Sequence, residues 1–163
     1  MNDVVIFDFV SNSNISSWQV INDGVMGGKS KSQFNCNDEG QGVFEGKISL
    51  ENNGGFCSVR YTCNPVSLTK NKFFIIRLKG DNKQYQFRVK SDKNNSHSYI
   101  FPFQTSGEWQ TITIPIQEMY PAFRGQKLAI PNYDGANLEE IAFLIGNKET
   151  ESFKLLINSI KVQ

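Results

Sequence analysis

Gly28, Lys29 and Ser30 end a glycine-rich segment whose residue types could cradle a phosphate group. A phosphate-binding loop of the form G-x-x-x-x-G-K-S needs its first glycine at position 23, where this chain carries Asp23. A carboxylate there would repel a phosphate, and no helical pattern follows Ser30 to contribute its dipole. The segment therefore predicts no nucleotide site.

Paired carboxylates could instead hydrolyse a glycosidic or phosphoester bond. The acids available for such a pair are Asp23, Glu45, Asp81, Glu108 and Asp134. Hydrolysis of a glycoside needs two carboxyl groups at a defined separation, and the sequence brings no particular pair together. No complete set of acid, base and nucleophile is visible, so no catalytic residue is predicted and a carboxylate-dependent hydrolase is kept as a third alternative.

Metal ligands and reactive thiols are sparse. His97 is the single histidine and lies in the polar stretch S-D-K-N-N-S-H-S, which is typical of a loop. Cys36, Cys57 and Cys63 lack C-x-x-C spacing, and the last two are expected on one extended strand, too far apart to bridge. We therefore expect reduced thiols, no metal site and no cofactor; a structural Ca²⁺ is left open, although no D-x-[DN]-x-[DN]-G loop supports one.

Polar side chains on alternating strands are the candidate binding residues. Gln86 and Arg88 share one strand face, Arg60 lies on such a face of another strand, and Arg77 opposes apolar neighbours, so three arginines are predicted to line one side of a sheet. Arginine forks there could bind a polyol, a carboxylate or a partner's backbone, or the face could simply be solvated. The full set of candidates for binding a ligand or partner is Trp18, Asp23, Arg60, Arg77, Asp81, Gln86, Arg88 and Arg124.

Alternation of apolar and polar residues dominates the chain and must position these side chains. Apolar residues recur at every second position in six runs, which are 74–78, 85–89, 99–103, 112–116, 141–145 and 153–157. Turn-forming clusters separate the runs, so the sequence predicts an all-β fold, an antiparallel β-sandwich of about ten strands. Helical signals are confined to 117–120 and a turn near 138–140.

Two glycine-dense segments are predicted to be structural turns, since glycine tolerates positive φ and close backbone approach. Their members are Gly24, Gly27, Gly28, Gly54 and Gly55. We expect Asp23, at the start of the first turn, to mark a tight junction of the sandwich, braced by an arginine from a neighbouring strand.

Bulk properties predict one domain over residues 1–163 with a well-filled core, because aromatic residues make up 12% of the chain. A formal net charge of +1 offers no global field to attract nucleic acid or an anionic membrane. The amino-terminal residues resemble a first strand rather than a signal peptide or presequence, and no apolar run could span a membrane. We therefore expect a cytoplasmic protein without a nucleic-acid partner or membrane insertion.

Ordered motifs over nearly the whole length resemble the complex I intermediate-associated protein 30 family. The motifs are Trp18, the segment 22–28 with Ser30, Phe44-x-Gly46, Gly54-Gly55-Phe56-x-Ser58-x-Arg60, Gly80-Asp81 with Tyr85, Phe87 and Arg88, then Trp109, Pro115, Phe123-Arg124-Gly125 and Phe153-x-Leu155-x-Ile157. The resemblance implies a galactose-binding-like jelly roll, related in shape to carbohydrate-binding modules, with no established catalytic residues.

The same resemblance implies a function in binding. Mitochondrial relatives have a chaperone-like role in assembling respiratory complex I, whereas this short, free-standing chain is similar to the bacterial members. We therefore predict a non-enzymatic interaction protein that holds a protein partner. The alternative is a module that binds a carbohydrate or another small ligand.

Overall fold

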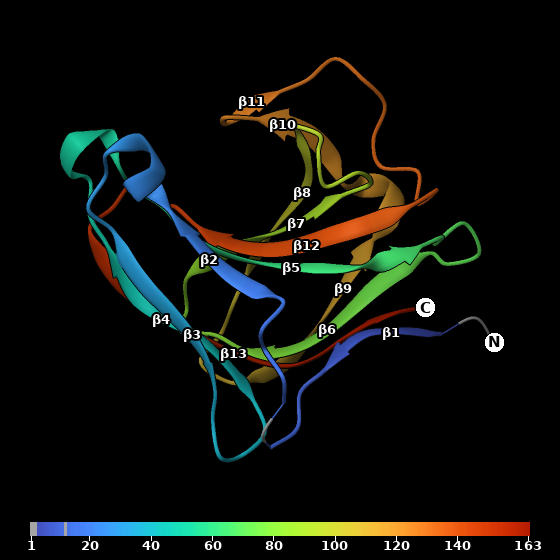
Figure 1. Ribbon diagram of the computed structural model, residues 1–163, viewed down its shortest axis with the longest axis horizontal. Coiled ribbons are helices and arrows are strands. Elements are labelled where there is room, and N and C mark those ends of the chain that lie inside the picture. Colours follow the sequence, from blue (N-terminus) through green and yellow to red (C-terminus); the bar gives the residue numbers. More distant parts are fainter. Residues whose placement is uncertain (1–2, 12) are drawn as a thin grey trace.

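The computed structural model describes residues 3–11 and 13–163, and its strands form two antiparallel sheets packed face to face (Figure 1). The six-stranded sheet has the order β3 (Lys31–Cys36), β4 (Gly42–Ile48), β13 (Glu151–Val162), β6 (Phe73–Lys79) and β9 (Trp109–Pro115), with β1 (Val4–Asp8) also paired to β13. The seven-stranded sheet has the order β11 (Gln126–Lys127), β10 (Tyr120–Phe123), β8 (Ser98–Gln104), β7 (Gln84–Lys90), β12 (Leu138–Ile145), β5 (Cys57–Val66) and β2 (Trp18–Asn22).

Alternating side chains build the core between the sheets, as period-two patterning requires. On β7, Tyr85, Phe87 and Val89 are buried and face the six-stranded sheet, where the Phe74 ring lies 5.0 Å from that of Phe87. Gln86 and Arg88 are thereby turned to the opposite face of the seven-stranded sheet. The predicted all-β sandwich is confirmed, and the polar face of the sheet is left to form a site.

Helical structure in the described residues is limited to three short 3-10 helices: η1 (Asp23–Met26), η2 (Glu51–Asn53) and η3 (Ile116–Glu118). The helical signal at 117–120 corresponds to η3, one turn that follows Pro115. The turn expected near 138–140 is wrong, because β12 begins at Leu138. The described residues contain thirteen strands rather than about ten, since short pairings such as β10 with β11 carry too few residues for a periodic pattern.

Aromatic rings fill one end of the sandwich. Trp18 is 7% exposed and stacks on Phe34 and Tyr61 with ring centroids 4.8 and 5.0 Å away. Phe7 and Phe9 complete the cluster, at 5.4 and 5.5 Å from Trp18. The cluster joins β1, β3 and β5 to β2, which is the edge strand of the seven-stranded sheet.

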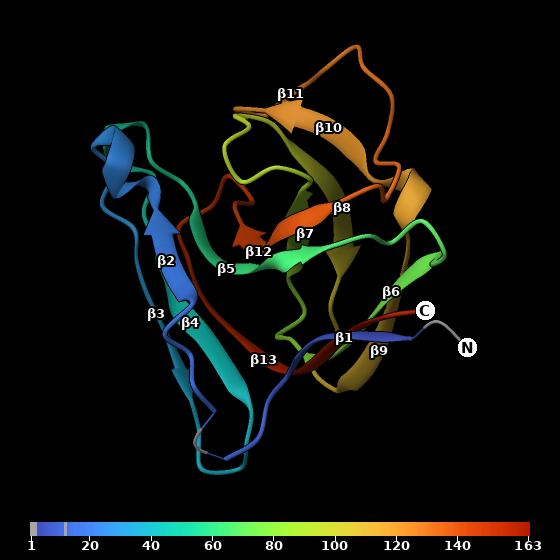
Figure 2. The same ribbon diagram turned by 45° about the vertical axis from the view of Figure 1, so that its right-hand side comes forward.

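The seven-stranded sheet curves, so that β10 and β11 rise at one side of it and β2 with η1 at the other (Figure 2). β12 lies in the middle of this sheet, between β5 and β7. No helix in the part of the chain that the structure describes has the length and apolar character needed to cross a membrane.

Candidate functional site

The face of the seven-stranded sheet turned away from the core carries a groove of about 950 Å³. Its floor comes from β5, β7, β8 and β12, and its sides come from β10, from the turn after η2 and from the loop after β12. Its lining includes Gly54, Gly55, Phe56, Ser58, Arg60, Gln86, Arg88, Lys90, Ser98, Ile100, Tyr120, Phe123, Arg124, Glu140, Ala142, Leu144 and Lys148.

One row of paired residues crosses the floor from strand to strand. Arg60 on β5 and Arg88 on β7 both pair with Ala142 on the strand between them. The row continues from Arg88 to Ile100 on β8 and then to Tyr120 on β10. Because paired residues project to the same face of a sheet, the two arginines flank the small Ala142 side chain at the centre of the groove.

Arg60 is held by neighbours in the floor. Its Nε lies 3.9 Å from Glu140 Oε1, and its Nη2 donates a hydrogen bond of 3.3 Å to Gln19 Oε1 on β2. The Glu140 side chain is only 8% exposed, so this carboxylate needs a cation to offset its burial. Arg60 serves as that cation while its own side chain is still 38% exposed to the groove.

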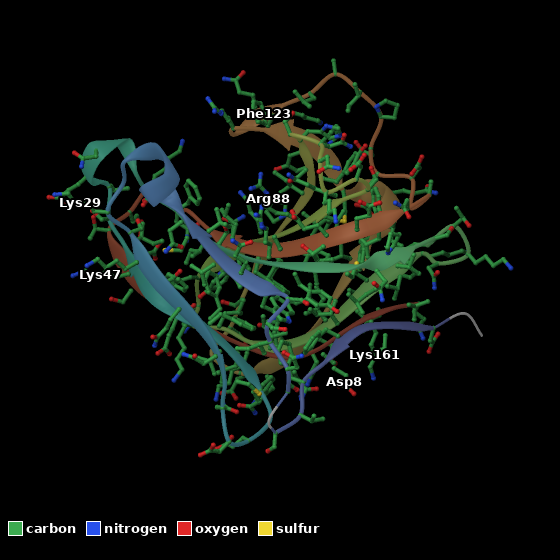
Figure 3. All side chains as sticks on the ribbon, in the orientation of Figure 1. Asp8, Lys29, Lys47, Arg88, Phe123 and Lys161 are labelled. Atoms are coloured by element: carbon green, nitrogen blue, oxygen red, sulfur yellow. The ribbon has the colours of Figure 1, made fainter. Side chains whose placement is uncertain are left out.

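Arg88 is different, because its guanidinium has no hydrogen-bond or ion-pair partner among the described residues. Its Nε is fully buried and unpaired. Burial lowers the pKa of Arg88, and the nearby Tyr120 and Glu140 counter that effect only in part. Arginine nevertheless stays protonated in proteins, so the floor of the groove holds a positive charge that its neighbours compensate only in part. In Figure 3 the Arg88 side chain lies between β2 and β10.

A second row of paired residues adds neutral polar groups. Gln86 on β7 and Ser58 on β5 both pair with Leu144, two residues along β12 from Ala142. The Ser58 hydroxyl is used by the fold, since it donates to the Ile21 carbonyl at 2.5 Å. The Gln86 amide has no partner among the described residues, so it can donate to and accept from a ligand.

The rim beside β10 is aromatic and cationic. Phe123, at the end of β10, is 39% exposed (Figure 3). The Arg124 guanidinium lies over its ring at 5.3 Å. Arg124 has φ +50° in the turn between β10 and β11. Lys148, also with positive φ, lines the groove from the loop after β12.

Asp23 is fully buried and lies behind the rim formed by Gly54 and Gly55, where it acts as a structural tie. Its Oδ1 accepts a hydrogen bond from Ser30 N at 3.0 Å, and its Oδ2 accepts from Ser30 Oγ at 2.5 Å and from Gly55 N at 2.6 Å. Phe56 N approaches the same oxygen at 3.3 Å. The expected arginine brace is wrong, because backbone N–H groups and a hydroxyl saturate this carboxylate.

These contacts join two of the connections that cross between the sheets. Asp23 and Ser30 bound the connection from β2 to β3, while Ser49 and Gly55 belong to the connection from β4 to β5. Ser49 N donates to Ser30 Oγ at 2.8 Å, which extends the network from Asp23 to both connections. The network therefore fixes the turn that forms one side of the groove.

Two of the five glycines predicted as structural turns have the positive φ that glycine tolerates. Gly27 and Gly55 have φ of +88° and +134°, which disfavour residues with a side chain. Gly28 and Gly54 both pack against the Asp23 carboxylate, where a Cβ atom would collide with it. Gly24, inside η1, faces open space.

The structure separates the sequence candidates into two groups. Arg60, Gln86, Arg88 and Arg124 line the groove together, whereas Trp18, Asp23, Arg77 and Asp81 do not.

Arg77 corrects the prediction of three arginines on one side. It lies on β6 in the six-stranded sheet, donates to Thr111 Oγ1 at 3.4 Å and has its guanidinium 5.9 Å from the Trp109 ring centroid.

Asp81 accepts from Tyr85 Oη at 2.9 Å and from Lys154 N at 2.8 Å, so it joins the turn before β7 to β13. Asp81 forms its ion pair with Lys83 rather than with an arginine.

Several lining residues were missed at the sequence level, above all Glu140, Tyr120 and Phe123. The alternation of Ile141 and Phe143 carried the signal for Glu140, because the residue before Ile141 must face the opposite side of the strand. Because residues 138–140 were expected to form a turn, Glu140 was not recognised as a residue of the polar sheet face. Among the described residues, no three His, Cys, Asp or Glu side chains converge as metal ligands.

Comparison with known proteins adds a family match. The family model described as complex I intermediate-associated protein 30 matches residues 7–157. An uncharacterized protein of Schizosaccharomyces pombe is 26% identical over 181 residues, which cover 97% of this chain and 83% of the yeast protein.

Solved structures share the sandwich fold at low sequence identity. A family 11 carbohydrate-binding module from Clostridium thermocellum, in complex with a β-1,3-1,4-mixed-linked tetrasaccharide, has a TM-score of 0.72 and 16% identity and covers 98% of this chain and 94% of the module. A family 29 carbohydrate-binding module variant gives a TM-score of 0.60 at 10% identity, over 100% of this chain and 92% of that one. An agarase structure has a TM-score of 0.66 and 13% identity; the match covers 100% of this chain and 25% of the agarase chain.

Proposed function

Since the chain belongs to the complex I intermediate-associated protein 30 family, we propose that it is a non-catalytic binding domain whose ligand lies in the groove of the seven-stranded sheet. The observation that carries this proposal is the Arg88 guanidinium on the groove floor, which has no hydrogen-bond or ion-pair partner among the described residues and whose Nε is buried. A buried polar group without a partner is costly to the fold, and a ligand that supplies the partner relieves that cost.

A carbohydrate is the ligand that the geometry favours. The groove combines exposed aromatic surface at Phe123 with hydrogen-bonding groups at Gln86 and Tyr120, which suits a ring that is apolar on its faces and polar at its edge. The clostridial module that shares this fold was solved with a tetrasaccharide, which supports the same class of ligand for this chain.

The chemistry available in the groove supports binding rather than hydrolysis. Of the described residues that line it, Glu140 alone carries a carboxylate, and that group is buried against Arg60. Canonical glycoside hydrolysis uses two carboxyl groups that flank the scissile bond. A carboxylate-dependent hydrolase therefore has the weakest support of the three alternatives.

A protein partner is the second candidate, and it rests on the family and on the groove rim. The family description names an association with a complex I intermediate. Leu50 and Phe123 are exposed apolar side chains on the groove lining, and aromatic residues are enriched at protein interfaces. A chaperone-like assembly factor would hold an exposed segment of its partner in the same groove.

Calorimetric titration of the folded protein against a panel of neutral and acidic oligosaccharides tests the carbohydrate proposal. We expect at least one glycan to bind, and Phe123→Ala to weaken that binding roughly 5-fold or more, because aromatic contacts are worth about 1 kcal/mol or more. The absence of heat with every glycan would contradict the proposal, and a polypeptide that co-purifies and is lost in Phe123→Ala would favour the second candidate.

Phe73→Ala is the matched control for this experiment. Phe73 is 37% exposed, close to the 39% of Phe123, but it lies on β6 in the other sheet. Each variant removes one exposed ring from a strand. Equal loss of binding in both would show that the site is not the groove.

A further inference from the structure

The groove lining is far more positively charged than the chain as a whole. Its lining includes five cationic side chains, Arg60, Arg88, Lys90, Arg124 and Lys148, and Glu140 is the carboxylate among the described lining residues. The whole sequence, by contrast, has a formal net charge of only +1. A concave surface lined by charge of one sign concentrates ligands of the opposite sign.

The charges in the floor are not balanced internally. Glu140 is the acid that pairs with Arg60, at 3.9 Å, and Arg88 forms no ion pair among the described residues. The Lys90 ammonium donates to the Asn95 carbonyl at 2.8 Å, a neutral acceptor that leaves its charge in place. An anionic group on a ligand would supply the missing countercharge.

The space between the two arginines suits an oxyanion. Both flank Ala142, whose methyl group leaves room above the floor, and each guanidinium presents a fork of N–H donors. Such forks match the two oxygens of a carboxylate or a sulfate. The free Gln86 amide in the next row can then bond a hydroxyl of the same ligand.

We infer that the groove binds an acidic glycan, with a carboxylate or sulfate group of one sugar ring seated against Arg88 and Arg60. This inference rests on the proposed function and narrows it from carbohydrates in general to sugars that carry an oxyanion. The uronates and the sulfated sugars share that chemistry, and only the experiment separates the two sources.

The test is a glycan array with neutral, uronate-bearing and sulfated oligosaccharides, followed by calorimetry on each hit and its neutralised partner. The partner is the methyl ester of a uronate or the desulfated form of a sulfated sugar. We expect binding to fall roughly 10-fold or more on neutralisation, in line with the strength of charge-assisted hydrogen bonds. It should also weaken with added salt.

Arg88→Met and Arg77→Met form a matched pair of variants. Arg88→Met keeps an apolar stem and removes the unpaired charge, so it should abolish the preference for the acidic form and raise Tm by roughly 2 to 4 °C. Arg77→Met removes the same charge from the opposite sheet and should leave affinity within 2-fold. A purely structural arginine at position 88 would instead give a lower Tm with the preference intact.

The outcomes separate the two levels of the proposal. Equal binding of a charged glycan and its neutralised partner, or hits confined to neutral sugars, would overturn the acidic-glycan inference and leave the carbohydrate function standing. No glycan hit, together with groove binding of an acidic peptide such as polyglutamate, would overturn both. The comparison of glycans on the unmodified protein decides the inference even if Arg88→Met fails to fold.

Discussion

The carboxylate of Asp23 accepts a hydrogen bond of 2.6 Å from the backbone N–H of Gly55, a residue 32 positions later in the chain. This contact ties the connection between β2 and β3 to the connection between β4 and β5. The glycine motif that first suggested chemistry is thus part of a tie between two connections that cross between the sheets, and the candidate binding residues lie beside it.

Asp23→Asn should lower the free energy of unfolding by about 2 to 4 kcal/mol, because buried donors from Ser30 and Gly55 would face an amide instead of a carboxylate. Urea unfolding at neutral pH measures this loss. Asp38→Asn is the control, since Asp38 is exposed and its change should stay within about 0.5 kcal/mol. Equal losses in both variants would contradict the tie.

The contribution of Asp23 should also depend on pH. Burial alone would raise the pKa of Asp23, but hydrogen bonds from Ser30, Gly55 and Phe56 outweigh it and lower the pKa below the usual value. Stabilisation from this group is therefore fully present above about pH 5 and is lost as the pH falls through the folded-state pKa. Urea unfolding measures the free energy of unfolding of wild type and of Asp23→Asn from pH 7 to pH 3. We expect the difference between the two proteins to narrow as the pH falls, and a constant difference would refute this.

Gly28→Ala should destabilise the fold by about 1 to 3 kcal/mol, because the new Cβ would lie 2.5 Å from Asp23 Oδ1 and force it away from its donors. Gly24→Ala is the internal comparison four residues earlier. No atom lies within 4 Å of a Cβ at that position, so this change should be neutral or slightly stabilising. Thermal unfolding of the pair distinguishes close packing from a general need for glycine in the turn.

Two thiols should react slowly while the protein is folded. Burial raises the pKa of Cys57 and of Cys63 to about 11, so at pH 8 the thiolate fraction is roughly 100-fold lower than for a free cysteine. Mass spectrometry after timed alkylation, with and without urea, measures the protection at each site. Rapid labelling of Cys57 in the folded protein would show that the core between β5 and the six-stranded sheet opens readily.

Much of the fold could be predicted because its signal is local. The alternation around Tyr85, Phe87 and Val89 fixes which face of β7 enters the core, and it placed Gln86 and Arg88 on the other face correctly. Glycines 27 and 55 were identified as turns for the physical reason that the structure displays, a positive φ.

The assembly of the groove could not be predicted in the same way. Strand order decides which polar faces become neighbours, and alternation carries no information about strand order. Arg77 and Arg88 have equivalent patterns along their own strands but belong to different sheets. Arg60 and Glu140 lie 80 residues apart in sequence and meet because β5 pairs with β12.

The row that carries Arg60 and Arg88 also sets a fixed distance. Neighbouring strands lie about 4.8 Å apart, so two positions separated by one strand have their α-carbons roughly 10 Å apart. Backbone hydrogen bonds from β12 to β5 and β7 hold that separation constant when a ligand binds. The sheet thereby holds the two arginine backbones at a fixed spacing, so a single oxyanion of the kind we infer would have to sit above Ala142, within reach of both guanidinium groups.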